Sequence, residues 1–80
     1  MKNKLEYITN NMKSYRNRVG LSQKQTAEKL GISRITYNDY EVNPIKVKIE
    51  VFQNLADLFG CEIYDFFVEH NVTKSNNIQE

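Results

Sequence analysis

Apolar residues recur at helical spacing along most of this 80-residue chain, and this periodicity constrains the fold more than any other feature of the sequence. Ile8, Met12, Tyr15 and Val19 follow one another at i, i+4, i+7 and i+11, which places them on one face of a helix. No segment alternates between apolar and polar residues over a length typical of a strand. The sequence therefore predicts an all-α fold, and its length suits one domain with a small core.

Glycines and capping residues divide the periodic pattern into five expected helices, over residues 8–19, 23–30, 34–41, 48–59 and 63–68. Gly20, Gly31 and Gly60 stand where helices are expected to end. Ser22 and Ser33 are expected N-caps, because a serine hydroxyl accepts from the unpaired N–H groups of the first turn. The remaining residues expected to face the core are Ala27, Leu30, Ile32, Tyr37, Tyr40, Ile49, Phe52, Leu55, Ala56, Phe59, Ile63, Phe66 and Phe67.

The stretch "SRITYND" concentrates hydrogen-bonding side chains on one short helix. Ala27 in the preceding helix is small enough for a close helix crossing, and Gly31 suits a sharp turn with a positive φ. Gln23, Ala27 and Gly31 follow at intervals of four residues, on one face. A fixed crossing angle of this kind lets one helix lie across a DNA backbone while the next enters the major groove.

At this point the sequence resembles a known family. "GLSQKQTAEKLGISRITYNDYE", together with "MKSYRNRVGLSQ" before it and "IEVFQNLADLFGCEIYDFF" after it, is similar to the lambdoid phage repressor and Cro-like helix-turn-helix proteins of the Xre-like family. The resemblance covers about residues 8–68 and follows the family's order of five helices. It implies a compact five-helix, lambda-repressor-like DNA-binding domain over residues 1–70, followed by a polar and disordered C-terminal tail at 71–80.

The resemblance also implies roles for individual residues of the expected recognition helix, 34–41. Arg34 matches guanine O6 and N7 as a bidentate donor, Asn38 matches adenine N6 and N7, and Ile35 suits a thymine methyl. Asp39 has three open roles: it accepts from cytosine N4, orients Arg34, or repels phosphate. The further expected DNA contacts are Ser22, Gln23, Ser33, Thr36 and Lys46, with Lys48 as another phosphate anchor.

Arg16 and Glu41 occupy positions similar to a family ion pair between the first helix and the end of the recognition helix. Such a pair fixes the orientation of the recognition helix, although desolvation offsets much of its attraction. The chain departs from the family pattern at Tyr37 and Tyr40, where aliphatic residues are usual. Their hydroxyls need partners or must reach solvent, which makes one of the two tyrosines a candidate for contact with the DNA backbone. It departs again in the loop 42–47, which has no glycine and an early Pro44, and at Glu62.

Charge is distributed unevenly although the net charge is only +1. Residues 1–48 carry ten Lys/Arg against four Asp/Glu, a net charge of +6. Residues 49–80 carry one lysine against six acids, a net charge of −5. The basic half is compatible with polyanion binding, and the acidic half with a protein partner.

Other classes of function find no support in the sequence. Cys61 and His70 are the single cysteine and the single histidine, so neither a disulfide nor a metal site is expected, and Cys61 is read as a small buried apolar residue. No nucleophile–base pair or phosphate-binding glycine loop is identifiable, so no enzymatic activity, catalytic residue or cofactor is expected. The chain has no membrane-length apolar run and no signal-peptide pattern at its start, which favours the cytoplasm.

The sequence thus predicts a transcriptional repressor that binds double-stranded DNA as a homodimer on a near-palindromic operator. Exposed apolar residues among Tyr64, Phe67 and Val68 are the expected dimer surface. The alternative is an antitoxin or adaptor whose C-terminal half binds a partner protein.

Overall fold

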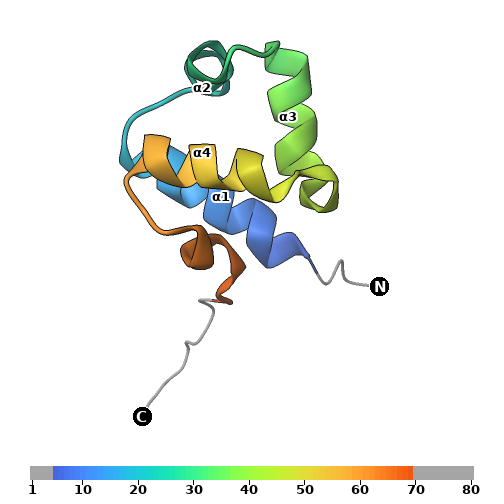
Figure 1. The fold of residues 1–80 in the computed structure, drawn as a ribbon, viewed down its shortest axis with the longest axis vertical. Helices are drawn as coiled ribbons and strands as arrows, with labels where there is room; N and C mark the ends of the chain where they lie inside the picture. The colour runs from blue at the N-terminus through green and yellow to red at the C-terminus, as the bar shows by residue number, and fades with distance from the viewer. Residues whose placement is uncertain (1–4, 70–80) are drawn as a thin grey trace.

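The computed structural model describes residues 5–69, and in this range the chain forms helices and no strand (Figure 1). In chain order the elements are α1 Glu6–Arg18, α2 Gln23–Leu30, α3 Arg34–Val42, the 3-10 helix η1 Pro44–Lys46, α4 Ile49–Phe59 and the 3-10 helix η2 Ile63–Phe67. The all-α prediction is confirmed. The expected tail at 71–80 and His70 lie outside the described residues.

Two short elements differ from the expected five α-helices. The last helix is a 3-10 helix, because its five residues are too few to build a ladder of i to i+4 bonds. A 3-10 turn that the sequence did not predict follows α3 and begins at Pro44. Proline has no N–H to donate and its fixed φ suits the first position of a turn, so the buried Pro44 ends α3 and redirects the chain toward α4.

The two expected N-cap serines are confirmed at the starts of α2 and α3. Ser22 Oγ accepts from Gln25 N at 3.0 Å, while Ser22 N donates to Gln25 Oε1 at 2.9 Å, which is a reciprocal capping box. Ser33 Oγ accepts from Thr36 N at 3.0 Å. These local bonds fix where each helix begins, independently of the rest of the fold.

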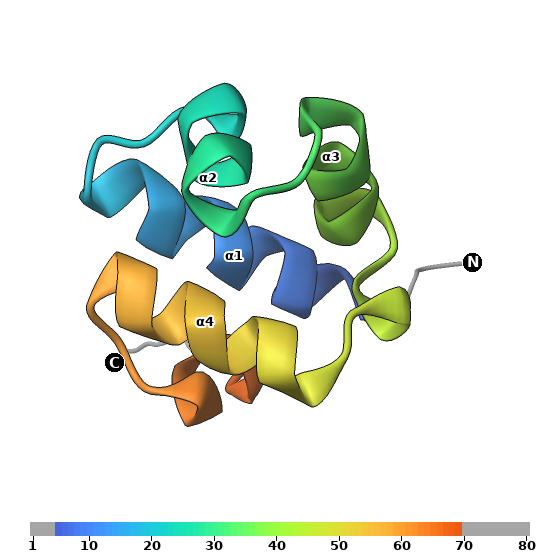
Figure 2. The same ribbon diagram turned by 45° about the horizontal axis from the view of Figure 1, so that its top comes forward.

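The helices lie in two layers with a small third element below them. α1 and α4 run across the middle of the molecule, α2 and α3 lie together on one side of them, and η2 lies on the other side (Figures 1 and 2). η2 contacts both α1 and α4, so the aromatic residues that it carries close the core from beneath. α3 thereby has one side on the domain and its other side on the surface.

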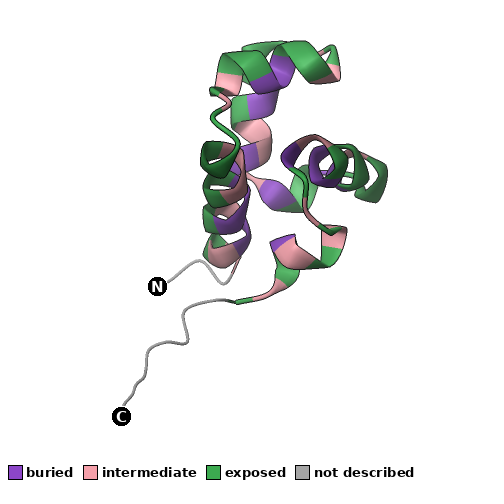
Figure 3. Cartoon of the chain, turned by 90° about the vertical axis from the view of Figure 1, so that its left-hand side faces the viewer, coloured by how far each residue is buried: buried purple, intermediate pink, exposed green. Residues whose placement is uncertain are grey.

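The core draws residues from every α-helix and from η2, and the buried sides of the helices face one another (Figure 3). Its buried apolar residues are Ile8, Met12, Ala27, Tyr37, Val47, Phe52, Leu55, Ala56, Phe59 and Phe66. The prediction was wrong for Val19 and Ile49, which are exposed. Val19 is the C-cap of α1, and Ile49 is the first residue of α4. Phe67, expected both in the core and at the dimer surface, is 37% exposed.

Gly31 makes the turn between α2 and α3, and the positive φ expected of it is confirmed at +73°. A Cβ built at Gly31 would meet nothing within 4 Å, so a side chain there would strain only the backbone. We expect Gly31→Ala to lower the free energy of unfolding by about 1–2 kcal/mol, the cost of a left-handed conformation for an L-residue. Urea unfolding measures this change. Gly31→Asn is the control and should lose less, because asparagine tolerates this region; equal stability of Gly31→Ala and the wild type would contradict the prediction.

Candidate nucleic-acid interface

The outward side of α3 is polar and fully accessible. Arg34, Ile35, Thr36 and Asn38 are all exposed, and Ile35 has 80% of its surface open to solvent. The opposite side is held by Tyr37, whose ring is buried in the core. The residues expected to read bases therefore lie together on one free helix surface, while the other side anchors the helix to the domain.

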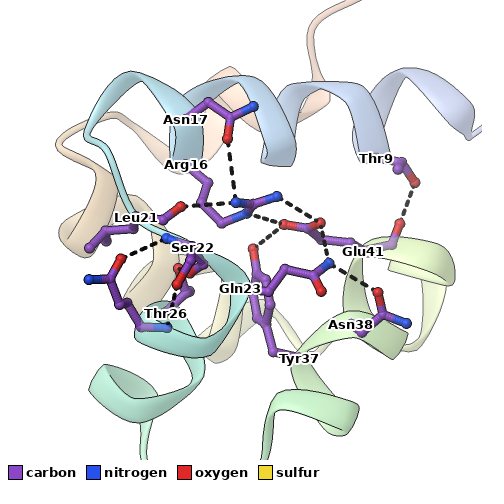
Figure 4. A network of polar contacts seen from close by, with 11 residues as sticks. Thr9, Arg16, Asn17, Leu21, Ser22, Gln23, Thr26, Tyr37, Asn38 and Glu41 are labelled. Atoms are coloured by element: carbon purple, nitrogen blue, oxygen red, sulfur yellow. Dashed lines mark hydrogen bonds and ion pairs between the residues drawn. The ribbon is translucent and has the colours of Figure 1, made fainter.

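The anchor of α3 is a buried carboxylate, that of Glu41, near the end of the helix (Figure 4). Arg16 of α1 donates from Nε to Glu41 Oε2 at 2.7 Å, and the exposed fractions of the two side chains are 11% and 1%. Tyr37 donates its hydroxyl to the same oxygen at 2.6 Å. The second guanidinium contact, Nη2 to Oε1, is longer at 3.4 Å. The residues expected to pair thus meet in the interior, and they tie α3 to α1.

Two further bonds join the same helices. Arg16 Nη1 donates to the carbonyl of Leu21 at 2.9 Å, which holds the segment between α1 and α2. Thr9 Oγ1 donates to the backbone carbonyl of Glu41 at 2.6 Å. Together they position the end of α3 and the entry to α2 against α1, so the angle between α2 and α3 is set by the body of the domain.

The network keeps Glu41 ionised. Burial favours the neutral acid, but hydrogen bonds from Arg16, Tyr37 and Gln23, together with the charge of Arg16, outweigh it and lower the pKa of Glu41 below 4.5. For Tyr37, burial and then the hydrogen bond to Glu41 raise the pKa of the phenol. The buried group is therefore an anion that accepts hydrogen bonds on all sides.

The lowered pKa of Glu41 predicts how stability depends on pH. A carboxyl whose pKa is lower in the folded state stabilises the fold fully above its unfolded pKa, and this contribution is lost as the pH falls through the folded value. We therefore expect stability to decrease progressively below about pH 4.5 as Glu41 becomes protonated, first in the unfolded chain. A carbon-13 NMR titration of the Glu41 carboxyl measures the pKa directly, and a value at or above 4.5 would contradict the prediction.

Gln23, at the first position of α2, connects this interior network to the surface. Its Nε2 donates to Glu41 Oε1 at 3.0 Å and also to Asn38 Oδ1 at 3.0 Å. The sequence suggested a phosphate contact for Gln23 and a base contact for Asn38 as separate roles. The structure brings the two side chains together, at the junction between the start of α2 and the outer side of α3.

Asp39 and Lys46 form a second, exposed cluster near the C-terminal end of α3. Asp39 Oδ1 accepts from Asn43 Nδ2 at 2.9 Å, and its Oδ2 lies 3.4 Å from Lys46 Nζ. The hydrogen bond from Asn43, followed by that from Lys46, lowers the pKa of Asp39. Of the three roles open for Asp39, orientation of Arg34 has no support in these contacts, since the carboxylate orients Asn43 and Lys46.

The hydroxyl groups expected at the interface have structural partners as well. Ser22 and Ser33 cap α2 and α3, and Ser33 Oγ donates to Thr36 Oγ1 at 2.9 Å. All three residues are exposed, and so is Lys48 at the start of α4. The caps hold the first turns of both helices, where the positive ends of the helix dipoles lie.

Sequence reasoning missed two buried polar residues. Asn11 in α1 donates from Nδ2 to the carbonyls of Phe66 and Val68, at 2.9 and 2.8 Å, and so binds η2. Thr26 Oγ1 donates to the carbonyl of Ser22 at 2.8 Å. Asn11 stands at i+3 from Ile8 and next to Met12. This position inside the apolar stripe could have indicated from the sequence that Asn11 is buried.

Metal-ligand groups, membrane-length helices and the single cysteine are the features of residues 5–69 that bear on other classes of function. No group of three or more potential metal ligands occurs there, and no helix in this range is long and apolar enough to cross a membrane. Cys61 is only half-buried, packed against the core, and burial raises the pKa of its thiol. The candidate site is the exposed helix surface around Arg34 and Asn38.

Comparisons with known proteins point to the same part of the chain. A family model described as helix-turn-helix matches residues 12–66. A protein of Sulfurisphaera tokodaii, whose name describes it as an HTH-type transcriptional regulatory protein, is 40% identical over 52 residues. That match covers 65% of this chain but only 18% of the other protein. No solved structure matches the chain significantly.

Proposed function

The chain belongs to the Xre- and Cro-like helix-turn-helix family, and from that membership we propose that it binds specific sequences of double-stranded DNA through α3 and regulates transcription. The observation that carries the proposal is the surface of α3, whose exposed polar side is held at a fixed angle by the buried pair of Arg16 and Glu41. A recognition helix needs this combination of free side chains and a rigid mounting. The regulator acts without catalysis.

The residues of the interface have matching chemical partners on DNA. Arg34 pairs with guanine O6 and N7 at the start of α3, and Ile35 packs on a thymine methyl. Phosphates lie next to the start of α2, where the helix dipole is positive, and the residues there are Ser22 and Gln23. The other phosphate contacts are Ser33, Thr36 and Lys46. Asn38 completes the base contacts, and Asp39 borders them.

Regulation in this proposal is repression by a homodimer that occupies a near-palindromic operator in the cytoplasm. One recognition helix offers few base contacts, so specific binding requires two half-sites about 34 Å apart. Tyr64 and Phe67, with 69% and 37% of their surfaces exposed, supply apolar area for such a dimer next to the partly buried Val68. The domain comprises residues 1–70.

Selection of bound fragments from a genomic library, at moderate salt and followed by sequencing, tests this function. Enrichment of a near-palindromic site would support a sequence-specific dimeric regulator and identify its target. Binding that has no sequence preference and disappears as salt is raised would contradict the proposal, because phosphate contacts alone behave in this way.

Arg34→Ala should weaken binding to the selected site by about 1–3 kcal/mol per half-site, because the bidentate contact to guanine is lost. A fluorescence titration against the selected duplex measures this loss. Arg34→Lys is the matched control: it keeps the charge and the salt dependence but loses the planar fork, so it should bind with relaxed base preference. Unchanged affinity and preference in Arg34→Ala would refute the role of α3 in recognition.

A second candidate is a protein-binding module, an antitoxin or adaptor. It is favoured by the acidic residues Glu62, Asp65 and Glu69, which border the exposed Tyr64 and Phe67. Sedimentation distinguishes the two: a homodimer favours the DNA-binding regulator, and a monomer that binds the product of a neighbouring toxin gene favours this module.

A further inference from the structure

The carboxylate of Glu41 can only accept hydrogen bonds, and this property determines the orientation of the groups around it. Its two oxygens take bonds from Arg16, Tyr37 and Gln23, and the side chain is 1% exposed. The lowered pKa of Glu41 keeps it ionised at neutral pH. The ionised carboxylate has no proton to donate, so each side chain that forms a hydrogen bond with it must present a donor.

The amide of Gln23 must therefore point its NH2 group at Glu41. One N–H reaches Glu41 Oε1, and the second reaches Asn38, 3.0 Å away, so both donors of Gln23 are used. Asn38 must then present its oxygen to Gln23, because two facing NH2 groups cannot bond. Within residues 5–69, no contact occupies Asn38 Nδ2, and the side chain is exposed.

We propose that Gln23 is a positioning residue that fixes the amide of Asn38 with its NH2 group toward DNA, so that the base opposite Asn38 must offer a hydrogen-bond acceptor. Adenine, guanine and thymine all offer one in the major groove, at N7, O6 or O4, whereas cytosine offers only its N4 amino donor. The domain therefore rejects cytosine at this position of its site. This inference rests on the proposed function. It assigns a role in specificity to the buried carboxylate of Glu41, which acts on the DNA contact through Gln23 and Asn38.

The orientation of the amides is testable without DNA. In the labelled wild-type protein, NMR should show the side-chain NH2 protons of Gln23 exchanging slowly with solvent, and those of Asn38 exchanging rapidly. The reverse pattern, with Asn38 protons protected and Gln23 protons open, would overturn the inference, whatever the protein binds.

The effect on specificity is tested by selecting DNA from a randomised library with the wild type, Gln23→Ala, Gln23→Met and Asn38→Ala. The base position that Asn38 contacts is identified as the one at which Asn38→Ala loses its sequence preference. At that position the wild type should disfavour cytosine by about tenfold or more. Both Gln23 variants should lose this rejection, because a free Asn38 amide can rotate and present its oxygen to cytosine N4. Preference at positions read by Arg34 should not change.

Two results would overturn the inference while leaving the proposed function intact. In one, the Gln23 variants still reject cytosine at the Asn38 position. In the other, they lose affinity equally for all sequences and their salt dependence falls, as expected of a phosphate contact. A wild-type protein without any sequence preference would overturn the proposed function and the inference together. Thermal unfolding of both Gln23 variants confirms that they are folded, and Gln23→Met keeps the apolar volume of the side chain.

Discussion

Glu41→Ala is expected to lower the free energy of unfolding by about 3–5 kcal/mol, which is the usual cost of removing one partner of a buried ion pair. The substitution leaves the guanidinium of Arg16, only 11% exposed, without its carboxylate. It also removes the acceptor of the buried Tyr37 hydroxyl. A domain of this size has a total stability of roughly 4–12 kcal/mol, so the substitution should remove a large fraction of the free energy of unfolding.

Urea unfolding followed by circular dichroism measures this loss, and two variants interpret it. The triple variant Arg16→Met/Tyr37→Phe/Glu41→Leu removes both charges and the buried hydroxyl and fills the space, so it should recover most of the stability, as apolar replacements of buried pairs often do. Lys46→Ala removes one partner of the exposed pair with Asp39 and should leave the unfolding midpoint nearly unchanged. If Glu41→Ala were no less stable than Lys46→Ala, the network could not be what holds α3.

Phe66→Ala should also cost about 3–5 kcal/mol, because it removes a fully buried aromatic ring and leaves a cavity. The ring contacts three others at centroid distances of 6.0, 5.6 and 6.3 Å, those of Tyr15, Phe52 and Phe59. Asn11 holds the backbone of the same residue at its carbonyl. The side chain of Phe66 therefore joins η2 to both α1 and α4.

The matched control for Phe66→Ala is Tyr64→Ala in the same element. Tyr64 is 69% exposed, so its truncation should change the unfolding midpoint little in a monomer. The same variant should weaken self-association in sedimentation experiments if this surface forms the dimer. Equal destabilisation by the two substitutions would contradict the placement of η2 against the core.

The order and positions of the helices follow from local signals in the sequence. The serine caps, the glycine at +73° and the apolar spacing each act within a few residues, and they predicted the bounds of α2 and the start of α3 correctly. Most of the core followed from the same spacing, since Met12, Phe52, Leu55 and Phe59 are buried. The pairing of Arg16 with Glu41 came from resemblance to a family, since spacing alone does not join residues 25 positions apart.

Only the tertiary structure decided which residues at the ends of the apolar stripes are covered, and which polar groups meet. Val19 and Ile49 are exposed although each continues the apolar stripe of its helix, and no local pattern reveals this. The bonds from Gln23 to Asn38 and Glu41 join residues 15 and 18 positions apart, and those from Asn11 reach 55 and 57 positions. Helix propensity and capping depend on neighbours in the chain, whereas these contacts depend on the angles at which packed helices cross. The sequence by itself therefore determined the helices and the surface of α3 that meets solvent, and packing determined how the amides on that surface are turned.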